Sequence, residues 1–228
     1  MPSADRRSAT RRRIFAVVAF LAICPAACAT AERSPDQTTN PDATAPINPG
    51  RIDRVRTALP AGYEFADLRG PVGPITAWGY RAPWRTDPAG CAVLADPTAG
   101  ATSSDGWSAS GPGGIVYAVV AAEPKDADPT VIDECARWTV SGGRTTGTVT
   151  LEPAPEIAGA STVAMSTAST TVVEGGTETH SHADTVTAYL KDHVAFVAVV
   201  TDPGSPNPQL GSDFAADLMG KTVSALRG

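Results

Sequence analysis

Apolar residues are spaced differently in successive parts of the 228-residue chain, and each spacing predicts its own kind of element. In residues 51–59 the apolar positions lie three or four apart, which predicts a short amphipathic helix. In residues 63–68 apolar and acidic positions alternate, which predicts a half-buried strand, and residues 75–80 form a second strand candidate. Residues 210–226 carry an apolar stripe of helical period and predict a closing helix.

Two segments in the first half of the chain begin with the same dipeptide, Asp87-Pro88 and Asp128-Pro129. Asp is a preferred N-cap residue and Pro is favoured at the first helical position. Both dipeptides therefore predict short helices, the first closed by Pro97 and the second running to about Arg137.

Six further segments have the Thr- and Val-rich composition or the apolar runs of strands. They are residues 103–110, 115–122, 145–151, 161–173, 177–190 and 193–201. Runs of strands with helices set apart from them favour an α+β fold, in which a central antiparallel sheet has helices packed on one side.

A two-residue turn at Lys191-Asp192 would fix the register of the last two strands. It pairs Leu190 with His193, Val186 with Val197, and Asp184 with Val199. The second of these strands, VAFVAVV, is apolar at every position, so we expect it to be buried on both faces.

The N-terminal segment predicts export. Five Arg residues lie among positions 6–13, and an apolar run follows at residues 14–24 and ends at Pro25. Eleven residues rise about 16 Å as a helix, which is too short to span a bilayer, so the run indicates a signal peptide. Arg12-Arg13-Ile14-Phe15 also resembles the core of a twin-arginine signal, which leaves the export route open.

Two cleavage sites compete at the end of this segment. Pro25-Ala26-Ala27-Cys28 resembles a bacterial lipobox, in which Cys28 becomes the lipidated N-terminus, although Pro25 stands where Leu is usual. Ordinary cleavage after Ala29 would instead release a secreted protein. The lipobox interpretation divides the chain into a signal peptide (1–28), a Pro-rich disordered tether (29–50) and one folded domain (51–228). It places the protein on the outer side of the cell membrane, held by its N-terminal lipid alone.

Charge excludes one class of partner. Removal of residues 1–28 takes away five Arg and one Asp, so the net charge of −6 becomes about −10. Such a surface repels phosphate backbones, and we expect no nucleic-acid binding.

Cys91 and Cys135 are the two cysteines that remain in the predicted domain. In an oxidising compartment a disulfide is their expected fate, and buried thiols are the alternative. Closing a loop of this length stabilises a fold by about 4 kcal/mol in the chain-entropy model.

No motif for catalysis or for a cofactor is present. The sequence contains no GxSxG elbow, P-loop or HExxH, and no GxGxxG after a predicted strand, so we assign no catalytic residues and no cofactor. An enzyme without a recognisable motif stays as the third and least favoured interpretation.

The segment TETHSHAD, residues 177–184, raises the question of a metal site. On a strand, Glu178, His180, His182 and Asp184 share one face. His193 would lie about 26 Å from His182 and could not complete the site. We favour an exposed strand end, with His180 and His182 as the candidate ligands if a metal does bind.

A cluster of aromatic and basic residues is the candidate ligand groove. It comprises Trp78, Tyr80, Arg81, Trp84 and Arg85. Trp and Arg often anchor ligands at the lip of an apolar groove. Core packing around a bend is the other interpretation of the aromatic residues.

An ordered series of segments resembles a known actinobacterial family. The segments are LPAGYEFADLRGPVGP, WGYRAPW, DPAGCAVLADP, VIDECARWTV and AYLKDHVAFVAVV, followed by the amphipathic closing helix. Over residues 51–227 the chain is similar to the extracellular sensor domain of the mycobacterial PknH-type serine/threonine kinases. It is also similar to the envelope lipoproteins of unknown function that share this domain.

The resemblance implies a mixed fold with a central antiparallel sheet, helices on one face and a cleft for an unidentified ligand. It implies no catalytic residues. The kinase sensor carries two disulfides, whereas only Cys91 and Cys135 are available here. We therefore expect a non-catalytic binding or sensor module for a small or lipidic ligand. The alternative is an interaction protein whose groove receives another envelope protein.

Overall fold

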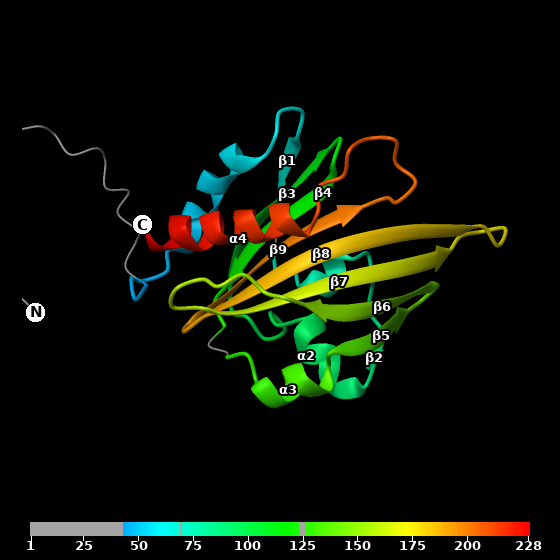
Figure 1. The fold of residues 1–228 in the computed structure, drawn as a ribbon, viewed down its shortest axis with the longest axis horizontal. Coiled ribbons are helices and arrows are strands. Elements are labelled where there is room, and N and C mark those ends of the chain that lie inside the picture. The colour runs from blue at the N-terminus through cyan, green and yellow to red at the C-terminus, as the bar shows by residue number, and fades with distance from the viewer. Residues whose placement is uncertain (1–42, 69, 124–125) are drawn as a thin grey trace, which may run out of the picture. The chain divides into compact units, whose positions relative to one another are not determined.

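The computed structural model describes residues 43–68, 70–123 and 126–228 (Figure 1). The predicted signal peptide, Cys28 and the predicted tether up to residue 42 lie outside these ranges. The last residues of the predicted tether are described, and they pack against the domain. Ile47 contacts the main core, and the Asn48 side chain accepts a hydrogen bond from the Gly50 N–H at 3.1 Å. The folded part therefore begins before residue 51.

The described residues form one nine-stranded antiparallel sheet in the order β1-β3-β4-β9-β8-β7-β6-β5-β2 (Figure 1). The strands are β1 (Glu64–Asp67), β2 (Trp84–Asp87), β3 (Ser104–Gly111), β4 (Gly114–Ala121), β5 (Arg137–Gly142), β6 (Thr145–Glu152), β7 (Ser161–Val172), β8 (Glu178–Leu190) and β9 (His193–Thr201). The two edge strands, β1 and β2, have four residues each, and short edges limit pairing with other chains.

The predicted register of the last hairpin is confirmed. Leu190 lies opposite His193, and the pairing continues through Asp184 opposite Val199. β9 lies between β4 and β8, and its residues from Val194 to Val199 are all buried, as its unbroken apolar sequence predicts.

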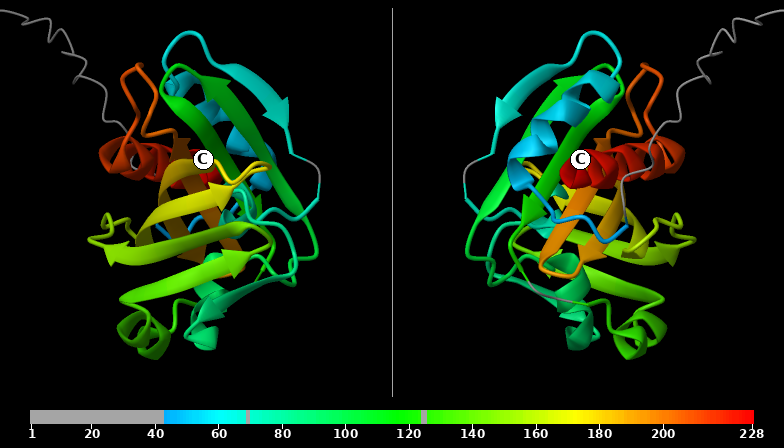
Figure 2. Two further views of the ribbon diagram at one scale, coloured as in Figure 1. Left: turned by 90° about the vertical axis from the view of Figure 1, so that its right-hand side faces the viewer. Right: turned by 90° about the vertical axis from the view of Figure 1, so that its left-hand side faces the viewer.

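Helical segments pack on both faces of the sheet. They are η1 (Pro49–Ala58), a 3-10 helix, α1 (Pro74–Ala77), η2 (Ala89–Cys91), α2 (Ala92–Ala95), α3 (Pro129–Glu134) and α4 (Ser212–Arg227). α4 and η1 cover the face to which Val186 of β8 points (Figures 1 and 2). Successive residues of a strand point to opposite faces, and Trp78, just after α1, donates a hydrogen bond to Thr185 on the other face.

The predicted α+β class is thus confirmed, with an antiparallel sheet, packed helices and one disulfide. The Sγ atoms of Cys91 and Cys135 are 2.11 Å apart, and their Cα atoms are 5.7 Å apart. Both cysteines are buried. The bond joins the end of η2 to the residue that follows α3, so it holds two short helices together on the sheet face away from α4.

Two predictions of local structure are wrong. Residues 75–80 do not form a strand, because Pro74 follows Gly73 at a helix start and the Trp78 N–H bonds to the Pro74 carbonyl at 2.9 Å. Asp87 does not cap a helix, because it is the last residue of β2. By contrast, Asp128 caps α3 as predicted, and its carboxylate accepts a hydrogen bond from the Thr130 N–H at 2.9 Å.

Two strands were not predicted at all, β2 and β5. They pair with each other at one end of the sheet. Their sequences, WRTD and RWTVSG, are short and carry few apolar residues, so neither has a clear strand signature. β1 was expected to be half-buried, but all four of its residues are exposed because it is an edge strand.

Candidate functional site

The predicted aromatic groove does not form as expected, because its two central residues lie in the core. The side chains of Trp78 and Tyr80 are only 3% and 2% exposed. The Trp78 Nε1–H donates to Thr185 at 2.9 Å, and the Tyr80 hydroxyl shares a 2.9 Å hydrogen bond with Ser169. The helical turn of α1 directs this segment inward over the sheet, so core packing around a bend describes these two residues.

The other three groove candidates lie near the edge strand β2. Trp84 is half-buried, whereas Arg81 and Arg85 are exposed. None of the five groove candidates lines either of the two cavities described below.

The segment TETHSHAD begins one residue before β8 and continues along it, so its alternate residues share one face of the strand as predicted. His180 Nδ1 is 3.1 Å from the Thr170 hydroxyl on β7, and His182 Nε2 is 3.2 Å from an oxygen of Asp184. Across residues 43–68, 70–123 and 126–228, no three His, Cys, Asp or Glu side chains gather closely enough to hold a metal ion. The segment provides a His–Asp pair, not a ligand cluster.

The surroundings of His182 and His193 shift their pKa values in opposite directions. The hydrogen bond to Asp184 raises the pKa of His182 above 6.5, and the negative charge of Asp184 adds to this, while partial burial works against it. Burial lowers the pKa of His193 below 6.5, and the nearby charge of Asp192 opposes that shift.

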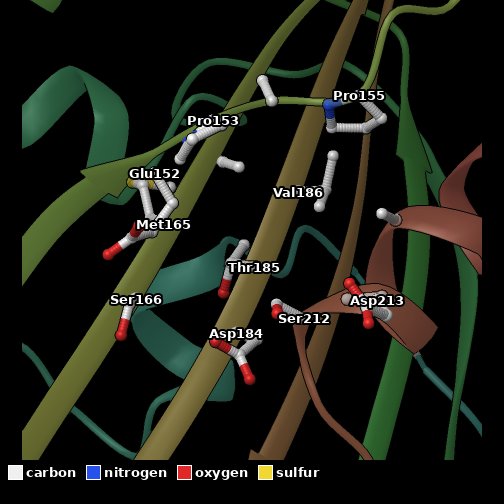
Figure 3. Close-up of a pocket in the computed structure, with 14 residues that line it drawn as sticks. Glu152, Pro153, Pro155, Met165, Ser166, Asp184, Thr185, Val186, Ser212 and Asp213 are labelled. Carbon is white, nitrogen blue, oxygen red and sulfur yellow. The ribbon is translucent and has the colours of Figure 1, made fainter.

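A cavity of about 510 Å³ lies beside the His–Asp pair. Four segments build it: the end of β6 with the loop that follows, the middle of β7, the middle of β8 and the first turns of α4 (Figure 3). Ala164, Val186 and Ala215 form its apolar floor, and Pro153 and Pro155 form one wall.

Strand register explains why these side chains meet. Ala164 pairs with Val186 and Ser166 pairs with Asp184, so all four point toward α4. The loop after β6 is held over this face by a hydrogen bond from the Thr162 hydroxyl to the Pro155 carbonyl, at 2.6 Å.

The ionisable side chains that line the cavity are all acidic. They are Glu152, Asp184 and Asp213, and no Lys, Arg or His is among the lining residues. The Asp184 side chain is only 15% exposed, and its charged partner is His182, which is positive only when protonated. Ser166 and Ser212 add hydroxyl groups, and Asp184 and Ser212 lie at the same end of the cavity (Figure 3).

Of the acidic and hydroxyl residues in this lining, sequence reasoning named only Asp184 as a candidate site residue, a possible metal ligand. The others, Glu152, Ser166, Ser212 and Asp213, come from three separate segments of the chain and form no motif. Ser166 and Asp184 carry no distinctive sequence signal, because the strands that hold them, STVAMSTASTTV and ETHSHADTVTAYL, contain many other polar residues.

Within the described ranges, no helix is both long enough and apolar enough to cross a membrane.

Comparison with known proteins identifies a family of unknown function. A family model described as "Domain of unknown function (DUF5642)" matches residues 48–227. No curated protein matches the chain.

Two solved structures are similar. One is the X-ray structure of an uncharacterised protein of Mycobacterium smegmatis, an ortholog of Rv0999. It is 18% identical with a TM-score of 0.57, over 83% of this chain and 99% of that chain. The other is the extracellular domain of PknH from Mycobacterium tuberculosis, 15% identical with a TM-score of 0.40, over 78% of this chain and 92% of that chain. The first likeness shows a shared fold, and the second is too distant to add to it.

Proposed function

The chain belongs to the DUF5642 family, and we propose that it is an exported, non-catalytic binding module that holds a small ligand in the cavity between β6, β7, β8 and α4. The observation that carries this proposal is the cavity itself. Its volume of about 510 Å³ lies within the range of small-molecule sites. An apolar floor with a few converging polar groups is the usual composition of such a site.

The charge of the cavity limits the class of ligand. Three carboxylates in one lining would repel a phosphate or a carboxylate, so the ligand is neutral or cationic at its polar end. The floor of Ala164, Val186 and Ala215 suits a short apolar body. A small lipidic molecule with an uncharged head group fits both conditions.

Export and anchoring are part of the same proposal. A basic segment followed by a short apolar run supports export, as does the disulfide, which persists in oxidising compartments. The lipobox-like sequence supports lipidation of Cys28 and a place on the outer side of the cell membrane. The intact mass of protein purified from the envelope would distinguish a lipid on Cys28 from a shorter secreted form.

The binding proposal is tested by filling the cavity. Ser166 of β7 lines it, whereas Ala168 lies two residues further on the same face of the same strand, is exposed, and does not line it. We expect the neutral fluorescent probe N-phenyl-1-naphthylamine to bind the native protein. Ser166→Trp should abolish this binding, and Ala168→Trp should leave it unchanged.

Equal binding by native protein and Ser166→Trp would refute the proposed site. Native mass spectrometry of protein from its own envelope would then decide between ligand and partner. A retained small molecule that Ser166→Trp excludes supports the binding module. Capture of one envelope protein by the native chain, lost in Ser166→Trp, would instead favour an interaction protein that uses the same surface.

A further inference from the structure

A second cavity, of about 550 Å³, lies at the ends of β3, β4 and β9 and shares no lining residue with the first. One wall is the tight turn between β3 and β4, and the other is the loop that joins β9 to α4. A hydrogen bond of 3.0 Å from the Leu210 N–H to the Gly113 carbonyl joins the two walls.

The lining of this cavity is rich in hydrogen-bonding groups and almost without charge. Its polar side chains are Ser110, Ser181, Thr201, Ser205, Asn207 and Gln209. No Lys, Arg or His lines it, and its single carboxylate, Asp202, already accepts a hydrogen bond from the Gly204 N–H at 2.8 Å. An anionic ligand would find no opposite charge here and a cationic one only that of Asp202, whereas a neutral ligand that both donates and accepts hydrogen bonds would find many partners.

Several of these groups have no partner in the described protein. The hydroxyls of Ser110 and Ser181 and the side-chain amide of Asn207 make no hydrogen bond there. Thr201 is only 4% exposed, and its buried hydroxyl also lacks a partner. The Thr201 hydroxyl is closed off from solvent, so the groups available to a ligand are those of Ser110, Ser181 and Asn207, which can bond it without first breaking a hydrogen bond within the protein.

The turn that forms one wall is tightly packed from behind. A Cβ on Gly111 would lie 2.7 Å from the Tyr63 ring, and a Cβ on Gly113 would lie 2.8 Å from Leu210. The turn therefore has no room to shift, and a wall that does not reorganise lowers the cost of binding. Ile115, which is 38% exposed, adds an apolar surface beside the turn.

We propose that this second cavity binds a neutral, polyhydroxylated ligand, a sugar or short oligosaccharide, through Ser110, Ser181 and Asn207, with the apolar face of one sugar ring against Ile115. Hydroxyl groups match the mixed donors and acceptors, and the C–H face of a pyranose matches the apolar surface. This site is distinct from the acidic cavity and does not depend on the function proposed for it.

The test is an NMR titration of ¹⁵N-labelled protein that lacks only the predicted signal peptide. The probes are three neutral trisaccharides, maltotriose, cellotriose and triacetylchitotriose, each up to about 20 mM, because weak sugar binding lies in the millimolar range. We expect one of them to shift the backbone amides of Gly113, Gly114 and Gly204 and the side-chain amide of Asn207. Amides that line the first cavity should not move.

Variants identify the groups that bind. Ser110→Ala and Asn207→Ala should each weaken the titration by about fivefold, as expected for a lost hydrogen bond. Ser108 lies on the same face of β3 and lines neither cavity, so Ser108→Ala is the matched control and should bind like the native protein. Well-dispersed spectra establish that each variant is folded.

Three results would overturn the inference. The first is the absence of shifts with all three sugars, and the second is an equal loss of affinity in Ser108→Ala. The third is an equal response to the neutral peptide N-acetyl-triserine amide, which would show that the cavity does not select sugars. Shifts confined to Ser166 and Ser212 would also reject this site, while supporting the first cavity.

Discussion

Gly147 of β6 provides a sharp test of where Tyr80 lies. A Cβ at this position would clash with the Tyr80 hydroxyl and would be 2.8 Å from both the Ala168 carbonyl oxygen and the Ser169 hydroxyl. The Tyr80 hydroxyl is held there by its hydrogen bond to Ser169. If Tyr80 were instead at the lip of a groove, an alanine at position 147 would still meet Ala168 and Ser169, but its contact with the phenol oxygen would be absent.

The magnitude follows from three contributions. Overpacking of a closed core costs about 1–3 kcal/mol. Displacing the Tyr80 hydroxyl from Ser169 removes a hydrogen bond worth about 1 kcal/mol. Replacing a strand glycine by alanine returns about 0.5–1 kcal/mol of backbone entropy. We therefore expect Gly147→Ala to lower the free energy of unfolding by about 2 kcal/mol, or the Tm by about 4–8 °C for a domain of this size.

Urea unfolding followed by tryptophan fluorescence would measure this effect, and a double-mutant cycle would assign it. In Tyr80→Phe the clashing oxygen is absent, so the loss in the double variant should be smaller than the sum of the single losses by about 1 kcal/mol. Gly220→Ala is the control, because Gly220 lies in α4 with no atom within 4 Å of its added Cβ. That variant should be neutral or stabilised by up to about 1 kcal/mol.

Additive losses in the cycle would refute the contact between Gly147 and the phenol oxygen. A neutral Gly147→Ala would go further and show that the Tyr80 hydroxyl does not fill the space beside Gly147.

Other predictions concern the disulfide and the histidines. Replacing Cys91 and Cys135 together by Ala opens a loop closed over a sequence separation of 44 and should cost about 4 kcal/mol in urea unfolding; a loss below about 1 kcal/mol would contradict the chain-entropy argument. NMR titration should place the pKa of His182 above 6.5 and that of His193 below it, and Asp184→Asn should lower the pKa of His182 alone. Because the folded state raises the pKa of His182, this pair stabilises the fold below about pH 6.5 and the stabilisation is lost as the pH rises through the raised value. His193 acts with the opposite sign, so its contribution destabilises the fold as the pH falls below 6.5. If acidification changed the stability of Asp184→Asn and of the native protein equally, the assignment to His182 would be contradicted.

The strands with long, regular patterns could be predicted from the sequence. β7, β8 and β9 each extend over nine or more residues, and a two-residue turn leaves one register for the last hairpin. Short segments could not be predicted in the same way. The apolar run at residues 75–80 is buried in either conformation, so its burial does not distinguish a helical turn from a strand.

The same limit applies to the candidate sites: what depends on neighbours in the sequence could be predicted. Local order along the chain was enough to place His182 beside Asp184, because alternate residues of one strand share a face. It was also enough to pair two cysteines, since only two lie in the predicted domain. Both inferences depend on composition and on neighbours in sequence.

Only the tertiary structure decided where the cavities lie. The first requires the start of α4 to rest above Ser166 and Asp184, and the second requires the β3–β4 turn to meet the loop before α4. Contacts between segments far apart in the chain depend on strand order and helix docking, which the hydrophobic pattern of any single segment does not encode. The same packing drew Trp78 and Tyr80 into the core, because burying large aromatic side chains against the sheet removes more apolar surface from water than leaving them at an edge.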